Sequence, residues 1–417
     1  MTFNAPVRSI GLFLCSSVLV LTIFDSYIQL PVPFVKTLSA AFGVCFAVWW
    51  IISGVGINPR RGPQAFLLLF ILVVVSLEVF RYLAGETVSL SHFMQWFQIL
   101  IFFYIMLDIS YNWRSFRFLW LAFMLTTAAM ILLATSGLLR VEDGVQARTG
   151  FSGVNLNRQA YWYSIVAIFS LWALIERYGR AKTQEFATLG VVFLVLSYAV
   201  FNTGSRGAFG AHIIGISALF ALAFKNRNIK AYVIILPFVV IATAFIVLNS
   251  EALTSRLLGT LEGTEDNTRS DIWDASWELF KDNWIIGYGP GFQSELGARV
   301  GMRTISTHQA FLQILLAYGT VGFMAFSLVV VSIVRPIWKL RNTPLGALYL
   351  ALFAASFVFG FVADLIFNRL FIALLTLGAV AGMHTSLINA RLLGFWPMLL
   401  RGAKLKAQPV NRLDSIR

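Results

Sequence analysis

The chain has 417 residues, of which 58% are hydrophobic and 12% are charged, and its mean hydropathy is +0.78. Soluble domains carry about 25% charged residues, so this composition excludes an ordinary soluble domain and indicates a protein that crosses a membrane several times. The net charge of +13 does not indicate nucleic-acid binding, because many basic residues lie in short loops between apolar segments, where they set membrane orientation.

Long apolar segments follow one another along most of the chain. A helix needs about 20 apolar residues to span a bilayer, and about twelve segments meet this requirement. We therefore predict an all-α polytopic membrane protein. The predicted spans are residues 9–30, 34–56, 63–83, 92–110, 117–137, 159–178, 185–202, 206–224, 231–249, 308–334, 345–366 and 370–390.

The first two spans contain Cys15 and Cys45, which are the two cysteines of the chain. Cysteines inside apolar spans are inert packing residues, so we expect neither a disulfide framework nor a metal cluster. The first apolar segment has no convincing cleavage site and is interpreted as a retained helix rather than a signal peptide.

Lysine and arginine concentrate in one alternating set of loops and in the C-terminal tail. Because basic residues favour the cytoplasmic side, both termini are predicted to be cytoplasmic. The loop at 138–158, the turn at 202–206 and the long polar interval before residue 308 then face outward. The predicted organisation is a membrane domain of nine spans (1–249), an outside loop (250–307), a second membrane domain of three spans (308–390) and a basic cytoplasmic tail (391–417).

The outside loop is the longest polar interval of the chain, and such loops are usually functional. It contains a segment at 268–280 whose pattern predicts an amphipathic helix with Trp273, Trp277 and Phe280 on one side. Residues 287–291 read Gly-Tyr-Gly-Pro-Gly, which indicates a turn.

Three outward arginines, Arg148, Arg206 and Arg269, lie close to Gly, Asn or Ser. A single arginine beside a membrane is often only a snorkelling anchor or a lipid-phosphate contact. Arg206 is the sharpest case, because Ser205 can cap a helix that then begins with a cation at its positive end. This placement favours a bound anion, held by the guanidinium together with exposed backbone N–H groups.

His308 stands where the outside loop ends and the tenth span is predicted to begin, after Ser306 and Thr307 as possible helix caps. A helix N-terminus disfavours the imidazolium, so the neutral ring could accept a proton. The alternative is a histidine that only caps the helix or fills an interface. The other histidines are interpreted as structural: His92, His212 and His384.

The sequence contains no phosphate-binding loop, no His-Glu-x-x-His, no Gly-x-Ser-x-Gly and no Cys/His cluster. The acidic residues of the outside loop suit a solvated helix face better than a metal site. We therefore expect chemistry that depends on arginines and one histidine, without a nucleotide, a metal or another cofactor.

Taken together, these features resemble the O-antigen ligase/polymerase superfamily, which includes protein O-oligosaccharyltransferases and has a fold similar to the GT-C class. The resemblance covers the layout of nearly the whole chain. Its short motifs are Ser-Arg-Gly at Arg206, Arg-x-x-x-Trp at Arg269, the glycine turn with Phe292, and His308 at the end of the loop. Gln309 follows the histidine, where the family often has asparagine.

The resemblance implies transfer of a glycan from undecaprenyl pyrophosphate at the periplasmic face of the bacterial inner membrane. For an O-antigen ligase the acceptor is the lipid A–core oligosaccharide. His308 and Arg206 would be catalytic, as base and pyrophosphate-holding cation. The substrate would also be bound by Arg148, Asn155, Arg269, Gly289 and Gly291. A direct displacement would invert the anomeric centre.

Two alternatives remain open. An O-antigen polymerase or a protein O-oligosaccharyltransferase would use the same donor with another acceptor. A transporter of polyprenyl-linked glycans belongs to a different class, and transporters place ionisable groups near the bilayer midplane. The main intramembrane acids are Glu78, which Arg81 can neutralise one turn on, and Asp364, which lies close to the outer surface.

Overall fold

The computed structural model describes residues 62–86, 140–143, 148–151, 156–178, 182–224, 229–262, 268–303 and 305–363, with isolated residues between 10 and 48, 93 and 107, and 371 and 379. The predicted spans at 9–30, 34–56, 92–110, 117–137 and 370–390 therefore lie wholly or largely outside the described residues, as does the tail at 391–417.

The described part of the chain is mainly helical. Its elements are α3 (Gly62–Leu83), β1 (Arg140–Asp143), β2 (Arg148–Phe151), α6 (Leu156–Arg177), α7 (Thr183–Asn202), α8 (Arg206–Phe224), α9 (Ile229–Leu248), α10 (Glu251–Leu261), α11 (Thr268–Asp282), α12 (Phe292–Arg299), α13 (Ala310–Lys339) and α14 (Pro344–Gly360). Each predicted span that falls in this part is a helix. The amphipathic helix predicted within the outside loop is present as α11, and α10 and α12 lie beside it in the sequence.

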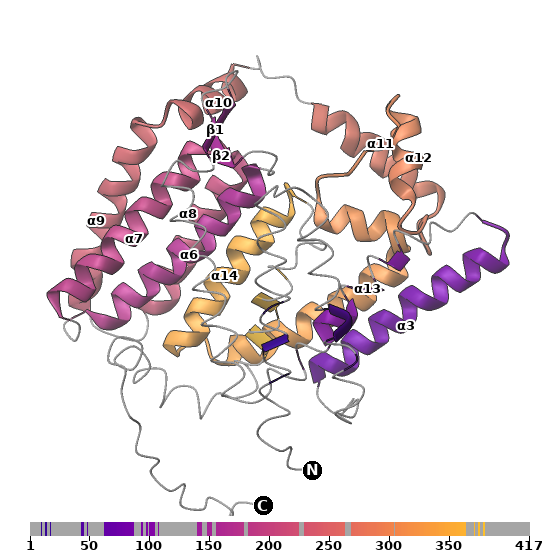
Figure 1. Cartoon of the computed structure of the whole chain (residues 1–417), viewed down its shortest axis with the longest axis horizontal. Coiled ribbons are helices and arrows are strands. Elements are labelled where there is room, and N and C mark those ends of the chain that lie inside the picture. The colour runs from indigo at the N-terminus through magenta and orange to yellow at the C-terminus, as the bar shows by residue number, and fades with distance from the viewer. Residues whose placement is uncertain are drawn as a thin grey trace, which may run out of the picture.

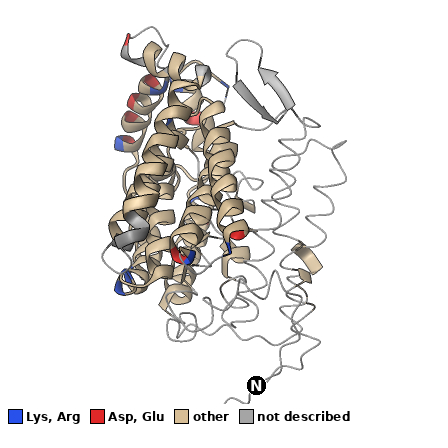
Figure 2. Ribbon diagram, turned by 90° about the vertical axis from the view of Figure 1, so that its left-hand side faces the viewer, with Lys and Arg blue, Asp and Glu red and all other residues tan. Residues whose placement is uncertain are grey.

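Among the described residues, α3, α7 and α13 are long and apolar enough to cross a membrane, and a bent pair, Val233–Leu248 with Leu253–Gly259, adds a fourth candidate. Long stretches of the helices carry no charged residue (Figure 2). The helices α7 and α8 are separated at residues 203–205, as the sequence predicts.

Most of the polar connections lie at one end of the helix bundle. The strands β1 and β2 and the helices α10, α11 and α12 occupy this end, which we call the loop end (Figure 1). It brings together the segments that the sequence analysis assigned to one side of the membrane. The helices α6, α7, α8, α9 and α14 form one group, and α13 packs against α3.

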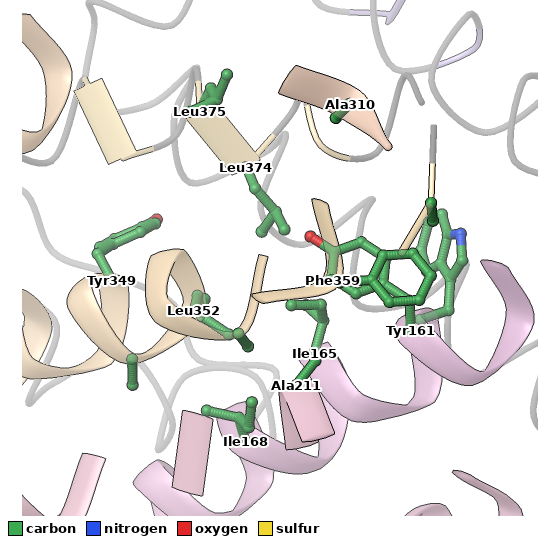
Figure 3. Close-up of a cluster of buried hydrophobic side chains, with 14 of the residues drawn as sticks. Tyr161, Ile165, Ile168, Ala211, Ala310, Tyr349, Leu352, Phe359, Leu374 and Leu375 are labelled. Carbon is green, nitrogen blue, oxygen red and sulfur yellow. The ribbon is translucent and has the colours of Figure 1, made fainter. Parts of the chain in front are cut away.

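The helix α6 is buried along most of its length and packs against α7, α8 and α14. Tyr161 of α6 stacks on Phe359 of α14, with ring centroids 4.5 Å apart, and its hydroxyl lies 2.5 Å from the Ser356 hydroxyl. Figure 3 shows these rings within a cluster of buried side chains from α6, α8 and α14. This contact orients α14 against the bundle centre.

Glycines allow α8 to approach its neighbours closely. A Cβ on Gly215 would lie 2.4 Å from Ile168 Cδ1, and a Cβ on Gly207 would lie 2.1 Å from Val362 Cγ2. Small residues at such contacts are typical of membrane helix pairs. The first turn of α8 is thereby fixed against the segment that follows α14.

The helix α13 is not continuous, because Gly319 (φ 61°, ψ −163°) breaks it. The break frees backbone groups from the helix, and residues 284–289 of the outside loop bind them. The amides of Tyr288 and Gly289 donate to the carbonyls of Leu316 and Ala317, at 2.7 Å each, and the amide of Thr320 donates to the carbonyl of Trp284 at 2.8 Å. The predicted tenth span is therefore two helical pieces joined at a turn.

The strands β1 and β2 form an antiparallel hairpin that the sequence analysis did not predict. Arg140 pairs with Phe151 and Asp143 pairs with Arg148. Four-residue strands are too short to stand out in a hydropathy pattern dominated by membrane-length segments. They nevertheless pair each other's backbone groups in the segment before α6.

Candidate functional site

The site begins at the first turn of α8, which starts at Arg206 as the sequence predicts. The Ser205 hydroxyl accepts a hydrogen bond from the Ala208 amide at 3.3 Å, so Ser205 caps the helix. Gly204 has φ 61°, a left-handed conformation that ends α7 and allows α8 to start immediately. Arg206 therefore stands at the positive end of a helix dipole, where an anion is stabilised.

The C-terminal end of α14 connects this helix start to the beginning of α13. Phe311 of α13 packs on Phe357 and Phe361, with ring centroids 5.1 and 4.9 Å apart. Val362, directly after Phe361, fills the space beside Gly207. The structure thus brings the segments that carry Arg206 and His308, about 100 residues apart in sequence, to the same end of α14.

His308 lies two residues before α13, which begins at Ala310 with Gln309 as its N-cap. The prediction that the helix starts at His308 was therefore wrong. Ser306 and Thr307 do not cap the helix, because their hydroxyls accept hydrogen bonds from the amides of His308 and Gln309 at 3.4 and 3.2 Å. These local turns end the loop before the helix can begin.

The backbone of His308 is strained. Its φ is +50°, and among the described residues it is the one non-glycine with a positive φ. Such conformations cost about 1–3 kcal/mol and cluster at functional sites. Its side chain is neither fully buried nor fully exposed. The conformation therefore singles out His308 independently of its sequence motif.

The helix α11 holds the segment before His308. The indole N–H of Trp273 donates a hydrogen bond of 2.9 Å to the carbonyl of Thr307, a fully buried residue. Arg269 lies four residues before Trp273, so both project from the same side of the helix. The Arg-x-x-x-Trp motif thus places its arginine one helical turn from the contact with the histidine segment.

The predicted apolar side of α11 is only partly right. Ile272, Ser276 and Leu279 form the buried face, with Phe280 partly buried beside it, whereas Trp277 is 47% exposed. Trp277 differs because a buried face recurs every three to four residues, and Ile272 and Leu279 set that register rather than the two tryptophans.

The glycine turn lies close to both α12 and the break in α13. Gly289 is buried, and Gly291 is the N-cap of α12. Burial, together with the nearby Asp282 carboxylate, raises the pKa of Tyr288 in this turn. The Tyr288 phenol therefore remains protonated at neutral pH and can act as a hydrogen-bond donor.

Of the two remaining predicted binding residues, the structure places one. Arg148 begins β2, and this hairpin contacts α6 near the loop end. Asn155 lies outside the described residues, as does Asp364.

The contacts around the site were predicted only in part. The pairing of Glu78 with Arg81 was predicted and is confirmed at 2.5 Å. The hydrogen bonds from Arg81 to the glycine turn were not predicted, and neither was the contact of Phe311 with α14. The place of Arg81 within an apolar span was the one signal available, but it does not identify a partner about 200 residues away.

The site combines a guanidinium at a helix start with an imidazole at the end of a loop. The first can bind an anion, and the second can accept a proton. Among the described residues, no group of three His, Cys, Asp or Glu side chains is placed to hold a metal ion.

A family model described as O-antigen ligase matches residues 191–327, which include α8, α11, the glycine turn and His308. A search of curated proteins returns no match for the chain.

We predict that the Trp273 hydrogen bond restrains the histidine segment. Trp273→Phe removes the bond while keeping an aromatic ring, at a cost of about 1 kcal/mol, or about fivefold in local opening. Hydrogen–deuterium exchange at residues 305–309 should accelerate accordingly. Trp277→Phe on the same helix is the matched control and should leave that exchange unchanged. Equal exchange in both variants would show that Trp273 does not hold the segment.

Proposed function

Because residues 191–327 match the O-antigen ligase family, we propose that this membrane protein is a glycosyltransferase that joins a lipid-linked glycan to a lipid acceptor. In the specific form of the proposal, O-antigen glycan moves from undecaprenyl pyrophosphate to the lipid A–core oligosaccharide. The reaction takes place at the periplasmic face of the inner membrane, and both termini are cytoplasmic.

The observation that carries the proposal is the convergence of the Arg206 and His308 segments at the end of α14. A glycosyl pyrophosphate needs a cationic holder for its phosphates, and its acceptor needs a base. The start of α8 offers a guanidinium and the amides of a helix N-terminus. The segment before α13 offers an imidazole on a strained backbone that the surrounding contacts hold in place.

In the proposed reaction, His308 takes the proton from the acceptor hydroxyl as its oxygen attacks the anomeric carbon. The bond from that carbon to the phosphate oxygen breaks, and undecaprenyl pyrophosphate leaves with the electron pair. Arg206 binds the pyrophosphate and stabilises this negative charge, and Arg269 and Arg148 complete its binding. A single displacement inverts the anomeric centre. The donor is already activated, so neither nucleotide nor metal is needed.

Two other functions would use the same donor or the same membrane setting. A polymerase or protein O-oligosaccharyltransferase would transfer the glycan to a second glycan or to a protein. A transporter would move the lipid-linked glycan without breaking a bond. The enzyme is favoured over the transporter because the Glu78 carboxylate is neutralised by Arg81, so it is not a lone intramembrane charge of the kind transporters use.

One assay separates these functions. Purified protein is mixed with lipid-linked glycan and with lipid A–core, a second lipid-linked glycan or an acceptor peptide, in EDTA and without nucleotide. We expect transfer to lipid A–core. Transfer only to glycan or peptide would indicate the polymerase or the protein transferase. Movement of donor across vesicles without transfer would indicate a transporter, and activity restored only by a divalent metal would contradict the metal-free reaction.

We predict that Arg206 holds the pyrophosphate through its planar guanidinium. Arg206→Lys keeps the charge but loses the bidentate fork, so both Arg206→Lys and Arg206→Ala should weaken donor binding and transfer at least about tenfold. Arg299→Ala is the matched control, because Arg299 is exposed at the end of α12 and pairs with Asp282. Wild-type transfer by Arg206→Ala would remove Arg206 from the mechanism.

We predict that His308 is the base. Loss of a general base typically lowers the rate about 10²- to 10⁴-fold, so His308→Ala should lose transfer while keeping donor affinity. His308→Gln preserves hydrogen bonding without basicity and should be equally inactive. The two variants are compared for donor affinity and for transfer rate. Near-normal turnover by His308→Gln, or a loss of affinity as large as in Arg206→Ala, would make His308 a binding residue.

A further inference from the structure

The last turn of α3 carries a buried ion pair that the proposed mechanism does not use. Arg81 is 2% exposed and Glu78 is 5% exposed, and one guanidinium nitrogen of Arg81 lies 2.5 Å from the Glu78 carboxylate. Burying two charges costs several kcal/mol per ion unless further hydrogen bonds compensate. An ion pair at this depth therefore calls for a partner beyond α3.

The second terminal nitrogen of Arg81, Nη2, finds such partners in two other segments of the chain. It donates hydrogen bonds to the carbonyls of Ile286, Gly287 (3.1 Å) and Ala317 (3.0 Å). The first two carbonyls belong to the glycine turn and the residue before it, and the third belongs to the break in α13. One side chain of α3 thus joins two segments that are about 30 residues apart in the chain.

The glycine turn also completes the broken helix. In an unbroken helix the carbonyls of Leu316 and Ala317 would accept from residues 320 and 321. Here they accept from Tyr288 and Gly289, while the amides of Thr320 and Val321 donate to residues 284 and 285. Arg81 takes part in the same set of hydrogen bonds, because the Ala317 carbonyl also accepts from its Nη2. We call the set of Arg81, Glu78, residues 284–289 and residues 316–321 the clamp.

The clamp closes a loop that contains His308. Residues 289 and 317 are its two ends, and the helical piece at 310–318 runs from the clamp to the histidine segment. This piece is about 12 Å long at 1.5 Å per residue. A tilt of about 10° at the clamp would therefore shift its far end by about 2 Å. A displacement of about 1 Å in a catalytic group can cost about 100-fold in rate.

We propose that Arg81, together with Glu78, is a positioning residue for the transfer reaction: it fixes the helical piece at 310–318 and thereby the place of His308. This inference rests on the proposed function. The hydrogen bonds of the clamp join α3, the glycine turn and α13, and none of those named above involves the start of α8. Loss of the clamp therefore lowers the rate of transfer and leaves donor binding at Arg206 intact.

Gly289 provides a second way to disturb the clamp. A Cβ at this position would lie 3.1 Å from both Arg81 Nη1 and Glu78 Oε1, on a backbone with φ +75°. Gly301, in the same loop, has φ +73°, but a Cβ there would meet nothing within 4 Å. Gly289→Ala therefore adds backbone strain and a tight contact that the Arg81 and Glu78 side chains must relieve by shifting a few tenths of an ångström, whereas Gly301→Ala adds the strain alone.

The test compares Arg81→Lys, Gly289→Ala and Gly301→Ala in the full-length protein. Both Arg81→Lys and Gly289→Ala should lower kcat about 10- to 100-fold, and in Arg81→Lys, which changes no residue assigned to substrate binding, the donor Kd should stay within about twofold of wild type. Lysine cannot reproduce the fork that joins Glu78 to three carbonyls. Gly301→Ala should keep kcat close to wild type. A fall in the donor affinity of Arg81→Lys that matches its fall in kcat, or equal kcat in the two glycine variants, would overturn the proposal.

Hydrogen–deuterium exchange gives a readout that needs no substrate. In Arg81→Lys and Gly289→Ala, the amides of residues 288, 289 and 320 should exchange faster, and those at 305–309 should follow. If the clamp opens while residues 305–309 stay unchanged, the positioning role is wrong whatever the reaction is. If the amides of the clamp and those at 305–309 both exchange faster but the wild type shows no transfer, the proposed function fails, and the clamp still fixes the position of the His308 segment. If Arg81→Lys does not fold, the glycine pair decides.

Discussion

The break in α13 is the constraint on which the loop end depends. A helix interrupted within an apolar, span-length segment must find partners for its free backbone groups, because apolar surroundings offer none. Here a turn of the outside loop supplies amides and carbonyls to both sides of Gly319, and Arg81 supplies donors from α3. A polar loop is thereby built into the helix bundle, and the segment that carries His308 is tied at both ends.

Two further sets of contacts connect the broken helix to the segments that carry Arg206 and His308. The end of α14 touches the start of α8 through Val362 and the start of α13 through Phe361. The helix α11 touches the histidine segment through Trp273. The end of α14 thus contacts both the helix start that carries Arg206 and the helix that follows His308. The Trp273 contact and the hydrogen bonds at Gly319 involve the histidine side alone.

Glycine serves different purposes at different places in the chain. Gly207 and Gly215 permit close helix packing, as is usual in membranes. Gly287 and Gly319 face each other backbone to backbone, since a Cβ on Gly287 would lie 2.6 Å from the Gly319 amide. Both also have a positive φ, which side chains rarely adopt. Gly287 is therefore accounted for by backbone packing within the protein.

The sequence by itself determined the membrane class, the span-length helices and α11 of the described part, the Ser205-capped start of α8 and the pairing of Glu78 with Arg81, because hydropathy, caps and one-turn spacings are local. It misjudged where α13 begins and the burial of Trp277 in α11, since Ser306 and Thr307 form their own turns and Ile272 sets the register. Only the tertiary structure decided that α13 is broken and that Arg81 reaches Gly287 and Ala317. It also brought the segments of Arg206 and His308 to one end of α14. These contacts join residues from about 30 to about 240 positions apart, and no local pattern encodes which distant backbone groups will satisfy one another.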